Sequence, residues 1–344
     1  MRPLDKVTVR PTRRRVWLLL LLSSLLGAVA WTQAHTPVEQ RTSPTHQEEM
    51  ALSEEVLRQL QAKPPLSWTP SRTHFSRMRR ADVVRMLEDP KRLHPRTAQA
   101  VVTHRTSRDP LPASFDARTQ WGDCIHPIRD QQKCGSSWAM SATESLSDRF
   151  CIASNGSVTP QLSPQYMLSC DSNDYGCNGG YSSSSWGWLV HKGVVSEECM
   201  PYTSGDGTVE PCPTTDNCTT SGVPFQLYMA SSASQIVNPF STTLTCELIQ
   251  ASLMENGPVQ ASFMVYEDFL AYSSGVYEHV IGDMLGAHSA KLIGWGVDQD
   301  QNLPYWLAAN TWGTDWGMDG YFMILRGSEE CDIEGNVYAG TPSL

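Results

Sequence analysis

The first 123 residues contain no cysteine, and all ten cysteines of the 344-residue chain lie at or after Cys124. Cysteines gathered in this way are typical of a disulfide-bonded domain that folds in an oxidising compartment. The chain also lacks a long apolar run, because the stretch from Val16 to about Leu26 is too short to span a membrane comfortably. It lacks a cluster of metal-ligand residues and a phosphate-binding glycine loop as well, so we expect no metal and no cofactor.

The short apolar run has the flanks of a secretory signal. Arg13-Arg14-Arg15 precede it and Ala28-Val29-Ala30 follow it. This pattern predicts a signal peptide over residues 1–30. Cleavage after Ala34 and retention as a signal-anchor are the alternatives. We therefore expect a protein of the secretory pathway, in a lysosome-like acidic vesicle or outside the cell, with no stable membrane span after signal removal.

Basic residues are scarce in the larger part of the chain. Residues 111–344 hold 7 lysines and arginines against 26 acidic residues, a net charge of −19, whereas residues 1–110 carry +9, which leaves the −10 of the whole. Such an acidic domain argues against a nucleic-acid partner. The positive charge is dense between Arg72 and Arg108, so the two parts are complementary, although acidic vesicular proteins are also often simply acidic.

Residues 31–110 precede the acidic domain and contain a few packed pieces. Ser53–Leu60 predicts a short capped helix with three apolar residues on one face. Trp68–Met78 and Asp82–Leu87 are expected to form a second piece. Pro95–Pro110 is typical of an exposed linker, which is a usual site of proteolytic processing.

One stretch, Gln131-Gln132-Lys133-Cys134-Gly135-Ser136-Ser137-Trp138-Ala139, predicts a tight loop that leads into a helix. Trp138, Ala142, Leu146 and Phe150 recur every four residues and share a helical face, before Asn155-Gly156 ends the pattern. Ser137 is therefore expected at the helix N-terminus, where the partial positive charge stabilises an anion.

The segment Cys134-Gly135-Ser136-Ser137-Trp138 resembles the active-site segment of papain-like cysteine peptidases, most closely of the cathepsin B-like branch. In that family the fourth position is the nucleophilic Cys, and here it is Ser137. His288 lies 151 residues after Ser137, and Asn310 lies 22 residues further on. Their flanks, Gly286-Ala287-His288-Ser289-Ala290 and Asn310-Thr311-Trp312-Gly313, also fit, and the resemblance runs from Leu111 to the end of the chain.

The resemblance implies a role for each of these residues. His288 would be the general base and acid, Asn310 would orient its ring, and Trp312 would shield that contact beside the bound substrate. Gln131 would supply a side-chain N–H to the oxyanion hole, together with the backbone N–H of Ser137. The plainer alternatives are a structural histidine and a solvated loop amide at Gln131.

Two further segments resemble substrate-binding parts of the family. Gly179 and Gly180, after Cys177-Asn178, would let a substrate backbone pair edge to edge. Asn336 aligns with the floor of the S2 pocket, where cathepsin B carries an acid, so we expect a weaker preference for Arg; an ordinary surface residue is the alternative. The segment from Met200 to Pro211 is short and lacks His, so the occluding loop of an exopeptidase is expected to be missing.

The resemblance also implies disulfides, although spacing alone leaves their connectivity open. The expected pairs are Cys124–Cys151, Cys134–Cys177, Cys170–Cys212 and Cys199–Cys218. Cys331 matches an unpaired position, and Cys246 has no counterpart. Asn155-Gly156-Ser157 is an N-glycosylation sequon, whereas the one at Asn217 is poorer because its middle residue, Cys218, is expected to pair.

The fold that the resemblance implies is α+β and papain-like, with a helical left lobe and a β-barrel-like right lobe. Its expected strands are Tyr277–Ile281, Ala290–Gly296, Tyr305–Asn310 and Gly320–Leu325. The expected domains are a signal peptide at 1–30, a pro-segment at 31–110 and a peptidase domain at 111–344. The pro-segment would cross the cleft in reverse orientation and act as an intramolecular inhibitor.

Three functional hypotheses follow from Ser137. The first is a cathepsin B-like homologue that binds peptides or proteins in its cleft but is catalytically impaired or inactive. The second is an active endopeptidase that works through Ser137, His288 and Asn310. The third, an engineered knockout of an ordinary cysteine peptidase, is disfavoured by the intact signal and pro-segment.

Overall fold

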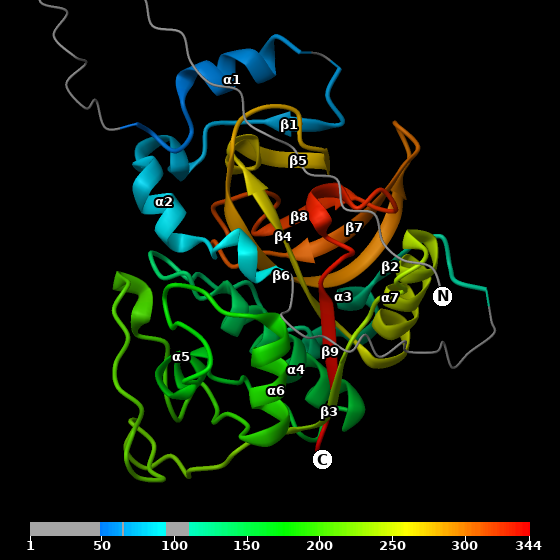
Figure 1. Ribbon diagram of the computed structural model, residues 1–344. Helices are drawn as coiled ribbons and strands as arrows, with labels where there is room; N and C mark the ends of the chain where they lie inside the picture. The colour runs from blue at the N-terminus through cyan, green and yellow to red at the C-terminus, as the bar shows by residue number, and fades with distance from the viewer. Residues whose placement is uncertain (1–48, 64, 94–109) are drawn as a thin grey trace, which may run out of the picture. The chain divides into compact units, whose positions relative to one another are not determined.

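The computed structural model describes residues 49–63, 65–93 and 110–344 (Figure 1). The predicted signal peptide and nearly all of the predicted linker lie outside the described residues. The described helices are α1 (Glu54–Gln61), α2 (Arg80–Met86), α3 (Ala117–Trp121), α4 (Ser137–Ala153), α5 (Pro164–Cys170), α6 (Ser182–His191) and α7 (Thr242–Asn256). The described strands are β1 (Trp68–Pro70), β2 (Phe115–Asp116), β3 (Ala230–Gln235), β4 (Val259–Tyr266), β5 (Tyr272–Tyr277), β6 (Met284–Asp298), β7 (Leu303–Ala309), β8 (Tyr321–Leu325) and β9 (Val337–Pro342).

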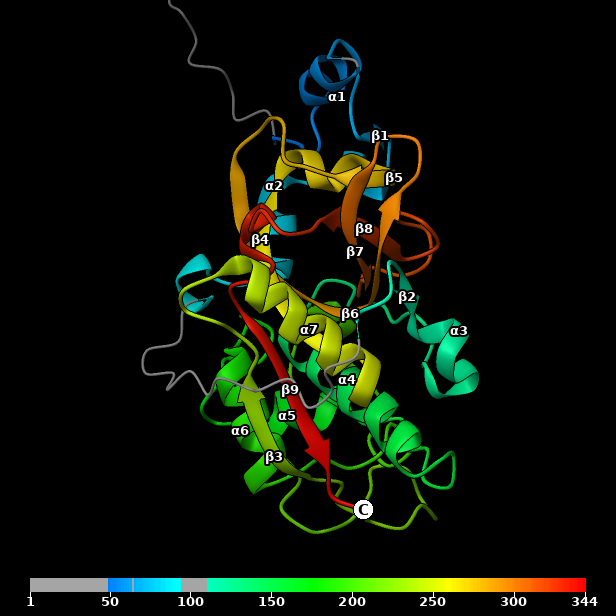
Figure 2. The same cartoon turned by 90° about the vertical axis from the view of Figure 1, so that its right-hand side faces the viewer.

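One mixed sheet joins these strands in the order β1-β5-β8-β7-β6-β4-β9-β3, and β2 pairs with β6. The long strand β6 is buried over most of its length and lies antiparallel to β4 and β7. Helices α4, α5 and α6 lie on one side of β6, and strands β5, β7 and β8 lie on the other (Figures 1 and 2). The α+β, papain-like fold expected from the sequence is confirmed.

The helical side has its own apolar core around α4. Trp138, Leu146 and Phe150 of α4 pack with Trp186 and Leu189 of α6, all at or below 2% exposure. The predicted stripe is therefore present, yet Ser137 to Cys151 are all buried, so α4 is enclosed on every face. A central helix of this kind holds its first residue in a fixed place.

The second core lies within the sheet and includes residues of the N-terminal segment 49–93. Strand β1 pairs antiparallel with β5, and Trp68 packs on Tyr277 with ring centroids 5.3 Å apart. Phe75 meets Trp312 edge to face at 4.8 Å and is fully buried. Segment 49–93 is therefore an integral part of this core.

The short helix predicted near Ser53 is present as α1. The Ser53 side chain accepts from the Val56 N–H, and Val56, Leu57 and Leu60 are buried on one face. The cap and the apolar face were both legible in the sequence, because each depends on residues within one helical turn.

The strand predicted at Tyr277–Ile281 is wrong, since β5 ends at Tyr277. Beyond it, the backbone N–H groups of Val280 and Ile281 donate to the buried Asp268 carboxylate at 2.7 and 2.9 Å. A carboxylate that captures consecutive N–H groups removes them from any sheet ladder. The β-branched composition was therefore overridden by a side chain 12 and 13 residues upstream of these two N–H groups.

Candidate active site

Ser137 begins α4 and is fully buried. Its hydroxyl donates to Oε1 of Glu88, in segment 49–93, at 2.6 Å and accepts the backbone N–H of Ser289 at 3.2 Å. The preceding Ser136 makes no side-chain cap to α4, and its hydroxyl lies 3.0 Å from that of Tyr202. The first turn of α4 therefore presents its N–H groups and its positive end at Ser137.

His288 lies within β6, Asn310 follows the last residue of β7, and the two side chains lie together. The His288 Nε2 is 2.7 Å from Asn310 Oδ1, which also accepts the N–H of Thr311 at 2.8 Å. Because that oxygen can only accept, Nε2 carries the proton and Nδ1 is left with a lone pair. Nδ1 is buried and has no hydrogen-bond partner among the described residues. Burial lowers the pKa of His288 to about 4, although the Asn310 contact opposes this.

Trp312 covers the His288–Asn310 pair. Its ring centroid lies 4.7 Å from that of His288, and it is 3% exposed. Three further rings contact Trp312, those of Phe269, Trp316 and Phe75, and Phe75 belongs to segment 49–93. Trp312 is therefore placed to shield the pair, and segment 49–93 covers Trp312 in turn.

Gln131 is fully buried, which is inconsistent with a solvated loop amide. Its Nε2 donates to the carbonyls of Met86 and Cys134 at 2.7 and 2.8 Å, and its Oε1 accepts from Thr311 Oγ1 at 2.6 Å. Its amide N–H therefore points to a carbonyl of segment 49–93, as an oxyanion-hole donor would point to a substrate carbonyl.

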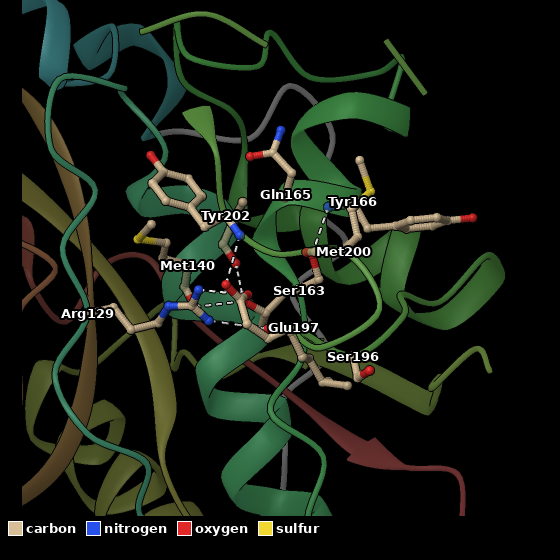
Figure 3. A network of polar contacts seen from close by, with 12 residues as sticks. Arg129, Met140, Ser163, Gln165, Tyr166, Ser196, Glu197, Met200 and Tyr202 are labelled. Carbon is tan, nitrogen blue, oxygen red and sulfur yellow. Dashed lines mark hydrogen bonds and ion pairs between the residues drawn. The ribbon is translucent and has the colours of Figure 1, made fainter. Parts of the chain in front are cut away.

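A polar network that the sequence analysis missed holds this loop in place, and Figure 3 shows its members Arg129, Glu197 and Tyr202. The Tyr202 hydroxyl donates to the Gln131 carbonyl at 2.8 Å, and its backbone N–H donates to Glu197 Oε1 at 2.8 Å. Glu197 pairs in turn with Arg129 at 2.7 Å. Burial raises the pKa of Tyr202 to about 12, so the phenol stays neutral and can donate. No local pattern pointed to Tyr202, because its partner lies 71 residues away.

Gly179 and Gly180 are buried at the end of a loop whose residues Tyr175 and Asn178 are exposed. The disulfide Cys134–Cys177 and the bond from the Gly135 N–H to the Cys177 carbonyl, at 2.9 Å, fasten this loop. A Cβ on Gly180 would lie 2.5 Å from the Trp138 ring, so packing alone demands glycine there. A role in pairing with a substrate backbone stays a prediction.

Asn336 lies one residue before β9, and 4% of it is exposed. Its carbonyl accepts from the Ser262 N–H at 3.0 Å, and its Oδ1 is buried without a hydrogen-bond partner among the described residues. An ordinary surface position is thereby excluded. A place in the floor of a substrate pocket stays a prediction for Asn336.

The structure contains the disulfides Cys124–Cys151, Cys134–Cys177, Cys170–Cys212 and Cys199–Cys218, which are the four pairs named above. Cys246 and Cys331 are free, and burial raises the pKa of both thiols. Asn155 lies in an exposed turn after α4, far along the helix from Ser137. It is accessible to modification and takes no part in the site.

Within the described part of the chain, no group of three or more His, Cys, Asp or Glu is placed to hold a metal ion. Nor does any helix in residues 49–63, 65–93 and 110–344 have the length and apolarity to cross a bilayer. The described site thus brings together a hydroxyl, an imidazole and an amide donor between the helices and the sheet, a set of groups suited to nucleophilic attack.

Comparison with known proteins gives the family. Residues 111–341 match the model of the papain family cysteine protease. Cathepsin B-like cysteine proteinase 4 of Caenorhabditis elegans is 43% identical over 267 residues, covering 71% of this chain and 79% of the relative. Cathepsin B-like cysteine proteinase 5 of the same organism is 38% identical over 333 residues, covering 88% and 94%. The structure of proCathepsin B S9 from Trypanosoma congolense has a TM-score of 0.75 at 33% identity and covers 85% of this chain and 99% of that one. The chain therefore belongs to the papain family of cysteine proteases, with cathepsin B-like homologues.

Proposed function

We propose that this protein is a precursor whose residues 111–344 form a peptide-binding cleft, and that its turnover is impaired because Ser137 stands at the position of the nucleophile. The observation behind the proposal is the Ser137 hydroxyl at the start of α4, which accepts the N–H of Ser289, the residue that follows His288 of the His288–Asn310 pair. His288, Asn310 and the amide donor Gln131 are in place, whereas the atom at the nucleophile position is the hydroxyl oxygen of Ser137.

The chemistry of the two nucleophiles supports impairment. A Cys thiol has a reference pKa near 8.5, and a helix N-terminus with an imidazolium lowers it to about 3.5–7.5, which stores a reactive thiolate. A Ser hydroxyl is far less acidic, so it must lose its proton to His288 during attack. Serine peptidases stabilise the resulting imidazolium with a buried carboxylate, whereas His288 is paired with the neutral Asn310.

An active serine endopeptidase is the second candidate. It is favoured by the neutral His288, whose unprotonated Nδ1 could accept the Ser137 proton. Peptide hydrolysis by the natural protein beside a variant without the hydroxyl decides between the two candidates.

We further propose that segment 49–93 is an inhibitory pro-segment, as in the procathepsin structures that the chain resembles. Three contacts support it: Glu88 on Ser137, Met86 on Gln131 and Phe75 on Trp312. The segment therefore lies on the hydroxyl, the amide donor and the shielding ring together. The cathepsin B-like relatives and the four disulfides support a secreted or lysosomal protein.

The short segment between Cys199 and Cys212 predicts the products of any restored activity. It forms only a small turn at Ser204–Asp206, and no histidine lies in it. With the cleft open at that end, a Ser137→Cys variant is expected to cut peptides internally, which mass spectrometry of a blocked peptide library would reveal. Stepwise release of C-terminal dipeptides as the main product would contradict this prediction.

Asn336 predicts the selectivity of the same variant. Adding Asn336→Glu to Ser137→Cys places a carboxylate beside the pocket, and we expect kcat/KM for Arg relative to Leu to rise about tenfold, because charge-assisted hydrogen bonds are the stronger kind. Asn336→Gln is the matched control and is expected to leave the ratio unchanged. An equal ratio for Glu and Gln at this position would remove Asn336 from the pocket.

A further inference from the structure

The Glu88 carboxyl group accepts hydrogen bonds from two serine hydroxyls. Its Oε1 accepts from Ser137 Oγ at 2.6 Å and from Ser289 Oγ at 3.2 Å. Glu88 is 5% exposed, and both serines are fully buried. Two buried hydroxyls that converge on one carboxylate oxygen form a built site rather than a chance surface contact.

A row of hydroxyls behind Ser289 is oriented by this contact. The hydroxyls of Ser262 and Ser289 lie 2.8 Å apart, as do those of Ser182 and Ser262. Each hydroxyl has one proton, so once Ser289 donates to Glu88, Ser262 must donate to Ser289 and Ser182 to Ser262. The three dipoles then align toward the carboxylate, and such chains polarise one another in a buried setting.

The backbone of Glu88 pairs with β6 in the way that an extended peptide ligand pairs with the edge of a sheet. Glu88 and Ala287 exchange both N–H···O bonds at 2.8 Å, beside His288. Leu87 is 4% exposed and lies close to Gly286. A Cβ added to Gly286 would be 2.7 Å from the Leu87 Cβ. An apolar residue followed by an acidic one thus occupies the edge of β6.

Ser137 is the residue that makes this site suitable for an anion. A thiolate at this position would repel a carboxylate, whereas a neutral hydroxyl donates to it. The positive end of α4 adds to the attraction. Ser in place of Cys at this position therefore removes the thiolate and supplies a hydroxyl that donates to a carboxylate.

We propose that Ser137 and Ser289 form a carboxylate-binding site, and that the open cleft holds peptides with an apolar residue followed by a carboxylate. The carboxylate could belong to an acidic side chain or to a free C-terminus, since both offer the same oxygens. The inference rests on the proposed peptide-binding function of residues 111–344, and it adds the chemical class of the ligand.

The site can be tested in the whole chain by chemical rescue. Glu88→Ala removes the equivalent of one acetate, so sodium acetate is expected to raise the melting temperature of this variant in a saturable way. Sodium chloride and acetamide should not raise it, and neither should acetate with the Glu88→Ala/Ser137→Ala double variant. Equal effects of acetate and acetamide, or a rise that survives in the double variant, would overturn the site.

The ligand class is tested with peptides, which also covers a Glu88→Ala variant that fails to fold. The natural chain is folded whole, cut at a protease site introduced between residues 94 and 109, and freed of its N-terminal segment. A labelled, C-terminally amidated peptide with the sequence of residues 83–90 is expected to bind at least about fivefold more tightly than its Glu88→Gln counterpart, because charge-assisted hydrogen bonds are about twice as strong as neutral ones. A smaller ratio overturns the inference.

Two more arms separate the remaining outcomes. A peptide that ends at Leu87 with a free carboxylate, set beside its amide, shows whether a C-terminus serves as well as a side chain. Tighter binding of the free acid assigns the C-terminal source, and equal binding leaves the side chain as the source. If none of the peptides binds, the proposed peptide-binding function fails; if the Glu and Gln peptides bind equally, only the inference fails.

Discussion

Replacing Ser137 by Cys is expected to raise peptide hydrolysis at least about a thousandfold, because loss of one member of a catalytic unit typically costs that much or more. The groups that a thiolate needs are in place: the start of α4, His288 with its free Nδ1, and the donor Gln131. Hydrolysis of a peptide library is measured for both proteins after the N-terminal segment has been cut and removed.

Two control variants accompany this comparison of hydrolysis rates. Ser137→Ala gives the background rate, and Ser137→Cys/His288→Ala tests whether the gain uses the imidazole. Loss of one member of a catalytic unit sets the scale for this comparison. If the natural protein cleaves peptides at a rate within about tenfold of the Ser137→Cys variant, the proposal of impaired turnover is wrong. The protein would then be a serine peptidase on a cysteine-peptidase scaffold.

The second large effect is release of the N-terminal segment by acid. Burial lowers the pKa of His288 to about 4 from an ordinary 6.5, and Glu88 of this segment pairs with Ala287 directly beside it. We expect removal of the segment to expose the ring to water, so that His288 binds a proton more readily in the open cleft than in the covered one. The affinity of the N-terminal segment for the rest of the chain is therefore highest above about pH 6.5, where His288 is neutral with and without the segment. It falls as the pH drops toward 4, because only the open cleft then gains the proton.

We expect the cut segment to bind about a hundredfold more weakly at pH 4.5 than at pH 7.5, the order that a shift of about two pKa units allows. Burial also raises the pKa of Glu144 to about 7 and of Asp174 to about 8, and these two act on overall stability in the opposite direction. The readout is therefore dissociation of the segment, followed by native mass spectrometry, and not the melting temperature.

His288→Gln is the matched control for the acid effect. It keeps a polar side chain beside Asn310 but cannot gain a proton in this range, so the pH dependence should flatten. Ion pairs such as those of Arg80 with Glu267 and Asp283 stay in both proteins. A pH dependence that is the same with His288→Gln would assign the effect to those charges instead.

The parts of the fold that depend on near neighbours were predictable from the sequence. The Ser53 cap and the apolar face of α1 lie within a few residues, and the stripe from Trp138 to Phe150 fixes α4. The end of β5 was not predictable, because Asp268 acts on Val280 and Ile281 from outside their own segment. Composition favoured a strand there, and a buried carboxylate decided against it.

The site shows the same division. The positions of Ser137, His288 and Asn310 followed from motifs and spacing, whereas Glu88 and Tyr202 did not. Glu88 reaches Ser137 across 49 residues, and Tyr202 reaches Gln131 across 71. Contacts of this kind depend on how segment 49–93 packs against residues 111–344 and on where a disulfide-bonded loop folds back, and neither leaves a local pattern.

The most direct test of impaired turnover compares the natural protein with Ser137→Ala, both freed of the N-terminal segment. Peptide binding and peptide hydrolysis are measured on the same samples, together with labelling by a serine-directed phosphonate. The account predicts that both proteins bind peptides, that their hydrolysis rates are the same, and that Ser137 is not labelled. Hydrolysis by the natural protein well above that of Ser137→Ala, with phosphonate on Ser137, would contradict it.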